Sequence, residues 1–179
     1  INGDKKTGIS MIKIDKGLDT GDIVLKKEID IGDNDTQIDL ENKLSKIGAE
    51  CFTNFFNLLD KNEIYEKQDN SKSTYAKKIL KSESKLNWNN SASTIVREIN
   101  AFNPKPGAWF EYENKRIKIW RAKLDVQDGK PGEVLDSNLK IACGKNSIQI
   151  IELQKEGKQS CSVEEYLRGN KITKGTILQ

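Results

Sequence analysis

A carboxylate framed by glycines stands between two apolar segments near the start of the chain. Asp19 lies in the polar run from Gly17 to Asp22, and Gly21 follows it by two positions. Glycine lets a backbone turn sharply or approach a ligand closely, and loop side chains often carry catalysis. The run is therefore either a simple polar turn or a turn that presents a carboxylate to a cleft.

The segments on either side of this run predict a β-hairpin. Both are short, rich in β-branched residues and bounded by Gly and Asp, which is typical of strands. The apolar residues expected in the two strands are Ile9, Met11, Ile12 and Ile14, followed by Ile23, Val24, Leu25 and Ile29.

Basic residues gather around Trp120 in residues 115–124, where alternation with apolar residues predicts a further strand. Such a strand is either a solvated edge, whose lysines deter pairing with another sheet, or a surface that follows an RNA backbone. The basic residues of this strand are Lys115, Arg116, Lys118, Arg121 and Lys123.

A second basic group lies in residues 65–85, a polar segment with little apolar periodicity. We interpret this segment as a linker that crosses the surface between two domains. Its Lys77, Lys78 and Lys81 are either solvated or in contact with phosphates.

Composition restricts the chemistry that these 179 residues can perform. The chain has no histidine, which excludes His-based acid–base catalysis within it. Its three cysteines are far apart and form no CxxC pair, which favours a reducing compartment and predicts no metal site. No apolar run is long enough to span a bilayer, so no membrane association is expected. Because the first residue is Ile1, we expect the protein to include residues upstream.

Apolar periodicity predicts a long amphipathic helix that begins after Asp35 or Thr36 and ends near residues 59–62. Each Å² of its apolar stripe left in water costs roughly 25 cal/mol, and a hairpin cannot cover the stripe alone. Another part of the protein is therefore expected to cover it. The expected core residues are Leu40, Leu44, Ile47, Cys51, Phe52, Phe55, Leu58 and Leu59.

The second half of the chain predicts a helix followed by a small β-barrel. Ser91 is the expected N-cap of the helix, and the proline-rich residues 103–107 end it. Short strands with Gly, Asn and Pro between them are typical of a closed or partly open barrel. The expected strands are residues 108–112, 115–124, 133–135, 139–143 and 147–153, before a short helix that starts at Ser162.

Three motifs occur in a specific order: KTG at residues 6–8, IDKGLDTGD at 14–22 and AFNPKP at 101–106. On these motifs the chain resembles the C-terminal part of the methionyl-tRNA formyltransferase family. The resemblance implies an α+β organisation with an α/β remnant. Residues 1–64 would be the hairpin-and-helix end of a Rossmann-like catalytic domain, 65–85 a basic linker, and 86–179 an OB-like barrel domain with a leading helix.

The resemblance also implies a function. Members of this family transfer a formyl group from 10-formyltetrahydrofolate to the methionyl amino group of initiator tRNA, in the cytoplasm. Asp19 would be catalytic, and the backbone of Gly17, Leu18, Thr20 and Gly21 would line the folate side. The family's catalytic asparagine and histidine would lie upstream of this sequence, so the chain alone is expected to be inactive. The barrel would hold the acceptor arm of the tRNA, and the full-length protein would be monomeric.

Two alternatives remain open from the sequence. The first is a part of another folate-dependent formyltransferase or hydrolase, which would share the hairpin loop without needing a basic barrel. The second is an RNA-binding module without catalysis. Affinity for tRNA would distinguish the methionyl-tRNA formyltransferase family from the first alternative. A Rossmann-like pattern with an Asn and a His upstream of this sequence would exclude the second.

Overall fold

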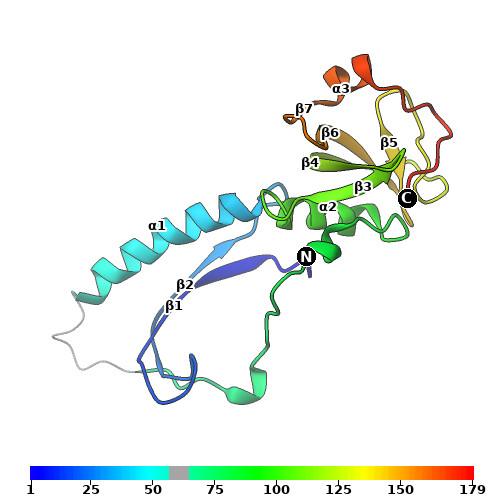
Figure 1. Ribbon diagram of the computed structural model, residues 1–179. Helices are drawn as coiled ribbons and strands as arrows, with labels where there is room; N and C mark the ends of the chain where they lie inside the picture. The colour runs from blue at the N-terminus through cyan, green and yellow to red at the C-terminus, as the bar shows by residue number, and fades with distance from the viewer. Residues whose placement is uncertain (57–64) are drawn as a thin grey trace. The chain divides into compact units, whose positions relative to one another are not determined.

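The computed structural model describes residues 1–56 and 65–179 (Figure 1). They divide into two compact units, each built from discontinuous segments. One unit holds Asp4–Gly32 and Ile38–Lys78, and the other holds Ile1–Gly3, Asp33–Gln37 and Ile79–Gln179. The predicted domain limits at residues 64 and 85 stay a prediction.

The predicted hairpin is confirmed. Strand β1 (Lys6–Ile12) pairs antiparallel with strand β2 (Ile23–Asp30), and the register shifts at Ile12. Ile14 was expected to belong to the first strand, and this was wrong. It lies beyond the end of β1 with 94% of its surface exposed, because the chain already leaves the ladder at Ile12.

Helix α1 (Gln37–Phe56) begins directly after Thr36, as its sequence predicts. Its predicted end near residues 59–62 lies outside the described residues, as do Leu58 and Leu59. Within the described part, only Cys51 of the expected core stripe is fully buried. Phe52 was expected in the core and is 56% exposed, because a single hairpin covers one side of the stripe only. The ion pair between Lys27 of β2 and Glu50 of α1, at 2.9 Å, joins the two elements.

Helix α2 (Ala92–Ala101) confirms the second predicted helix. The Ser91 side chain caps it by accepting a hydrogen bond from the Thr94 backbone N–H at 3.2 Å. Ile95 and Ile99 are fully buried one turn apart. The residues that follow α2 turn the chain into the sheet, and the Gly107 N–H donates to the Phe102 carbonyl at 2.8 Å.

The chain beyond residue 107 forms a 5-stranded antiparallel sheet. Its strands are β3 (Ala108–Tyr112), β4 (Lys115–Asp125), β5 (Lys140–Ala142), β6 (Ser147–Lys155) and β7 (Cys161–Ser162). They are ordered β3-β4-β6-β5, and β7 pairs with β6.

Two details of this sheet differ from the expectation. The predicted strand at residues 133–135 is reduced to isolated bridges, Glu133 with Ile177 and Val134 with Ile141. The short strand β7 was not predicted, because two residues carry no periodicity. The final helix α3 (Val163–Gly169) begins at the predicted Ser162, whose hydroxyl accepts from the Glu165 N–H at 3.2 Å.

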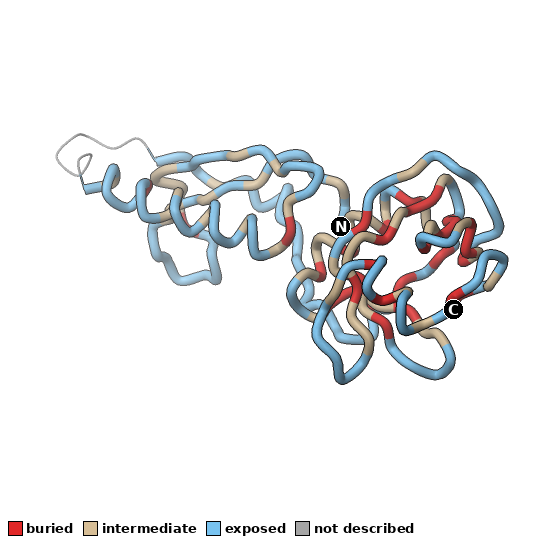
Figure 2. Tube along the Cα trace, turned by 90° about the horizontal axis from the view of Figure 1, so that it is seen from above, coloured by how far each residue is buried: buried red, intermediate tan, exposed pale blue. Residues whose placement is uncertain are grey.

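The apolar core of this unit lies between the sheet and the helices. Helix α2 packs on β4 and β6, and α3 packs on β6. Figure 2 shows buried residues concentrated here and sparse along α1. Among the described residues, no helix is both long and apolar enough to cross a membrane.

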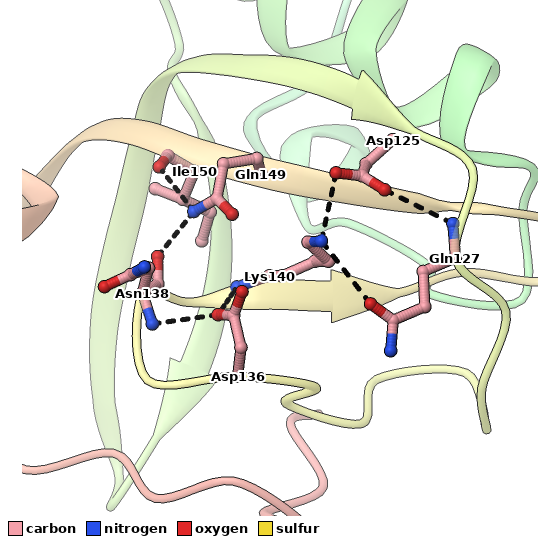
Figure 3. A network of polar contacts seen from close by, with 7 residues as sticks. All are labelled: Asp125, Gln127, Asp136, Asn138, Lys140, Gln149 and Ile150. Carbon is pink, nitrogen blue, oxygen red and sulfur yellow. Dashed lines mark hydrogen bonds and ion pairs between the residues drawn. The ribbon is translucent and has the colours of Figure 1, made fainter.

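A polar network holds β5 to the end of β4 (Figure 3). The Lys140 ammonium lies 3.1 Å from a carboxylate oxygen of Asp125 and 3.4 Å from the side-chain oxygen of Gln127. The Asp136 carboxylate accepts from the backbone N–H of Lys140 at 3.0 Å, which fixes the start of the strand. Lys140 is therefore tied at both its backbone and its side chain.

This network predicts a pH-dependent contribution to stability. The hydrogen bond from Lys140 holds the pKa of Asp125 below its ordinary value. The contribution is therefore complete above the unfolded carboxyl pKa, about 4, and is lost as pH falls through the lowered folded pKa. We expect Asp125→Asn to lower the urea midpoint at pH 7 and to converge with the wild type in acid. Asp4→Asn, at an exposed carboxylate, should track the wild type throughout. A pH-independent difference for Asp125→Asn would contradict this assignment.

Candidate functional site

The loop between β1 and β2 is closed at its neck and organised from within. The Lys13 N–H donates to the Asp22 carbonyl at 2.9 Å, where the two strands part. Inside the loop, one oxygen of the Asp15 carboxylate accepts from the Gly17 N–H at 2.9 Å and from the Thr20 hydroxyl at 2.7 Å. These bonds fold the chain back on itself before it reaches β2.

Asp19 sits in this loop with a backbone φ of 56°. This left-handed conformation is disfavoured for most side chains, and Asp is among the residues that tolerate it best. Asp19 is exposed, and its carboxylate has no hydrogen bond or ion pair within the described residues, where only its backbone carbonyl is engaged by another side chain. The carboxylate is therefore available to accept a hydrogen bond from an incoming group.

The two glycines are needed for close approach within the loop rather than for positive φ. A β-carbon on Gly21 would lie 1.6 Å from the Lys13 carbonyl oxygen, and one on Gly17 would lie 2.1 Å from the Thr20 hydroxyl. Gly21 is buried while Gly17, Leu18 and Thr20 are exposed. Contact of these backbones with folate stays a prediction.

Sequence reasoning missed two residues that contact this loop. Asp15 lies in the motif, but its side-chain bonds depend on loop geometry that the motif does not reveal. Gln68 lies 49 positions after Asp19, and its side-chain N–H donates to the Asp19 carbonyl at 2.9 Å. The only available signal was the polar character of residues 65–85, which equally fits a linker.

A separate group of aromatic and basic side chains lies on β3 and β4. Trp109 of β3 is paired with Lys118 of β4 in the sheet register. The Arg116 guanidinium lies 4.2 Å from the centre of the Trp109 ring, and the Lys85 ammonium lies 5.5 Å from it. Cations over an indole face are attracted by the negative face of the ring.

Trp120 forms the second half of this group, which we call the tryptophan–cation face and define by Lys85, Trp109, Arg116, Lys118 and Trp120. The Lys118 ammonium lies 5.1 Å from the centre of the Trp120 ring and donates to the Pro106 carbonyl at 3.0 Å. The Trp120 N–H donates to the Gln154 side chain at 3.1 Å. The cations are thus held by rings and carbonyls, and none of the three has a carboxylate partner in the described part of the chain.

The structure brings several of the predicted RNA-binding residues together on β4. Ile117, Ile119 and Ala122 are buried on one side of the strand, so Arg116, Lys118 and Lys123 lie on the other. The buried positions change from odd to even because the register against β6 shifts on both sides of Arg121.

The remaining predicted RNA-binding residues differ in their surroundings. Arg121 is exposed and lies 4.0 Å from the Glu152 carboxylate, so its charge is partly offset. Lys115 is exposed at the start of β4. Lys77, Lys78 and Lys81 are exposed, and the first two lie in the unit of the hairpin while Lys81 lies in the unit of the sheet.

Two segments of the chain match known family patterns. The pattern described as "Formyl transferase, C-terminal domain" matches residues 78–171, and that described as "Formyl transferase" matches residues 1–55. The chain belongs to the formyl transferase family. The Asp19 loop thus falls in the part that matches the formyl transferase pattern, and the tryptophan–cation face falls in the part that matches the C-terminal domain.

Individual relatives are consistent with this assignment. Methionyl-tRNA formyltransferase from Bradyrhizobium diazoefficiens is 41% identical over 177 residues, covering 96% of this chain and 57% of its own. Its counterpart from Rickettsia prowazekii is 40% identical over 181 residues, covering 100% of this chain and 59% of its own. The chain therefore spans less than two thirds of the length of these curated relatives.

Solved structures show the same fold. Methionyl-tRNA formyltransferase from Clostridium thermocellum is 29% identical with a TM-score of 0.53, covering 69% of this chain and 53% of its own. HypX from Aquifex aeolicus in complex with tetrahydrofolic acid is 17% identical with a TM-score of 0.68, covering 97% of this chain and 34% of its own. At that identity the HypX match concerns the fold alone.

The close approach of Gly21 to the Lys13 carbonyl in the Asp19 loop predicts that position 21 tolerates no side chain. Gly21→Ala forces the Lys13 carbonyl out of place, and we expect it to destabilise the chain by about 1–3 kcal/mol. Gly48→Ala is the matched control, because nothing lies within 4 Å of its β-carbon and it is in helix α1. That control should stabilise by up to about 1 kcal/mol. Urea denaturation measures both, and an unchanged Gly21→Ala midpoint would refute the steric argument.

Proposed function

We propose that this chain is the C-terminal part of a methionyl-tRNA formyltransferase, which moves a formyl group from 10-formyltetrahydrofolate to the methionyl amino group of initiator tRNA. The observation that carries the proposal is the roughly 40% identity to methionyl-tRNA formyltransferases along 96–100% of the chain. The free carboxylate of Asp19 supports it, because the motif that resembles the family's catalytic loop holds that carboxylate in the open. The proposal includes a cytoplasmic location and a monomeric full-length protein.

The finer organisation is proposed on the same basis. Residues 1–64 complete a Rossmann-like catalytic domain, 65–85 link the domains, and 86–179 form an OB-like barrel that binds RNA. The antiparallel sheet with α2 beside β4 and β6 supports the barrel assignment. The exposed Phe52 and Phe56 support the first, because a larger domain would cover them.

The proposed role of Asp19 concerns the proton that the methionyl nitrogen must lose, and not attack on the formyl carbon. The methionyl amine attacks as the neutral base, and the addition of its nitrogen to the formyl carbon leaves a positive charge on that nitrogen. A carboxylate placed nearby stabilises this charge or that of the general base which accepts the proton. Because the chain has no histidine, the base is proposed to come from the upstream part of the protein.

The tryptophan–cation face is the proposed surface for the tRNA acceptor arm, together with Arg121, Lys123, Lys115 and the lysines at 77, 78 and 81. Cations without carboxylate partners are free to neutralise phosphates, and releasing the counterions of the RNA drives binding. The cations that lie over indole rings already have restricted side chains. They therefore lose less side-chain entropy when they bind the RNA.

A second candidate is a formyltransferase that acts on a sugar amine. WlaRD, a sugar 3N-formyl transferase, is 24% identical with a TM-score of 0.67, covering 88% of this chain and 58% of its own. The higher identity to the tRNA enzymes and the basic character of β4 favour the first proposal. Binding of RNA by this chain distinguishes the two.

The catalytic assignment predicts that Asp19→Asn in the full-length protein lowers kcat by about 10²–10⁴-fold, since the amide keeps the size of the side chain and removes its charge. Asp4→Asn, an equal charge change at an exposed site in the same unit, should leave kcat unchanged. Formylation of charged initiator tRNA measures both. The isolated 179-residue chain should form no detectable product, and activity of that chain alone would refute the need for an upstream base.

The RNA assignment predicts a specific salt dependence. Lys118→Ala with Arg121→Ala should weaken binding of acceptor-stem RNA and reduce the slope of log affinity against log salt by about 1–2. Lys171→Ala with Lys174→Ala removes two positive charges from exposed residues outside the strands and should keep the wild-type slope. Fluorescence anisotropy from 50 to roughly 300 mM salt measures the slopes. Equal slopes for both double variants would reject the β4 surface.

A further inference from the structure

The Gln68 side chain donates hydrogen bonds to the Asp19 loop from outside the loop. Its side-chain nitrogen donates to the Asp19 carbonyl at 2.9 Å and to the Gly21 carbonyl at 2.6 Å. The two acceptors lie on either side of Thr20, so a single amide spans the part of the loop that follows the carboxylate. Gln68 is half-buried against this exposed loop.

The chemistry of the contact suits glutamine. Two carbonyl oxygens face the end of the side chain, and the NH₂ group of an amide supplies two donors without adding a charge. The same requirement fixes which way the amide points, since the amide oxygen would face both carbonyls if it were reversed. A carboxylate would be repelled, and an apolar side chain of equal size would leave both carbonyls without this donor.

The backbone that carries Gln68 is paired with β2 just before it and enters a capped turn just after it. Glu66 exchanges two backbone hydrogen bonds with Ile23 at the start of β2, at 2.8 and 3.0 Å. After Gln68, the Asp69 carboxylate accepts from the Ser71 N–H at 3.0 Å and from its hydroxyl at 2.6 Å, which begins a short 3₁₀ turn. Gln68 therefore projects from a segment that is paired with the hairpin two residues earlier.

Fixing the Asp19 carbonyl restricts the Asp19 side chain. The carbonyl and the side chain share one Cα, so a held peptide plane limits the direction of the Cα–Cβ bond. The left-handed φ of 56° at Asp19 is the less favourable backbone state, and bonds to the carbonyls at residues 19 and 21 select it. Asp15 performs the equivalent task from inside the loop, through Gly17 and Thr20.

We propose that Gln68 is a positioning residue of the formyl-transfer site, which acts by holding Asp19 in its productive orientation. The inference rests on the proposed function, because it requires Asp19 to be catalytic. It assigns the segment around residues 66–72 to the site itself, although its composition is that of a linker.

The test compares Gln68→Leu and Gln68→Glu in the full-length protein with Gln159→Leu and Gln159→Glu. Gln159 is an exposed glutamine outside the site, so it provides the same changes of polarity and charge. We expect both Gln68 variants to lower kcat at least about 10-fold while KM for the tRNA stays within about 2-fold. Activity of Gln68→Glu relative to wild type should rise as the pH falls, because the protonated carboxyl regains one donor.

A double-mutant cycle shows whether the effect passes through Asp19. In an Asp19→Asn background, Gln68→Leu should cause little further loss. Hydrogen exchange of residues 13–22 in the 179-residue chain gives a readout without catalysis, and Gln68→Leu should speed it at least about 10-fold.

The outcomes separate this inference from the function on which it rests. If Asp19→Asn inactivates the enzyme and Gln68→Leu keeps wild-type kcat, or if loop exchange is unchanged, the positioning role is rejected and the proposed function stands. If Asp19→Asn remains fully active, both are rejected. Independent, additive losses would show that Gln68 acts elsewhere than through Asp19, which also rejects the inference.

Discussion

The backbone beneath the exposed Asp19 carboxylate is held by a few specific polar contacts, and these contacts define the shape of the hairpin loop. The strands of the hairpin end at the Lys13–Asp22 bond, and Gly21 fits directly against the Lys13 carbonyl. Asp15 then binds the loop from within, and Gln68 binds it from outside. All of these contacts are hydrogen bonds or close backbone contacts between polar groups of a few residues. The loop has no apolar core of its own.

The unit of the sheet follows a different principle, in which one strand serves two purposes. The inner side of β4 contributes Ile117 and Ile119 to the core, and its outer side carries Arg116 and Lys118. The alternation of side chains along a strand allows both at once. The register shift near Arg121 changes the alternation without ending the strand, so the basic side extends as far as Lys123.

The two candidate sites differ in how much packing supports them. The tryptophan–cation face lies on the sheet that covers the buried core, and its cations lie over rings that are part of that sheet. The Asp19 loop lies in a unit where α1 leaves Phe52 and Phe56 largely exposed. Local hydrogen bonds such as those from Gln68 therefore contribute more to the stability of the loop, since little surrounding packing supports it.

The sequence by itself determined the hairpin, the starts of α1, α2 and α3, and the long basic strand. The helix starts depend on neighbours within a few positions, such as Ser91 and its cap bond to Thr94, so capping residues reveal them. The strands are revealed by their apolar residues and by the turn residues between them. The sequence also singled out Asp19 and the basic residues of β4. Only the tertiary structure decided what surrounds them. Gln68 meets a loop 49 positions earlier, and Trp109 meets cations from two different segments, because such contacts depend on how distant parts of the backbone fold together.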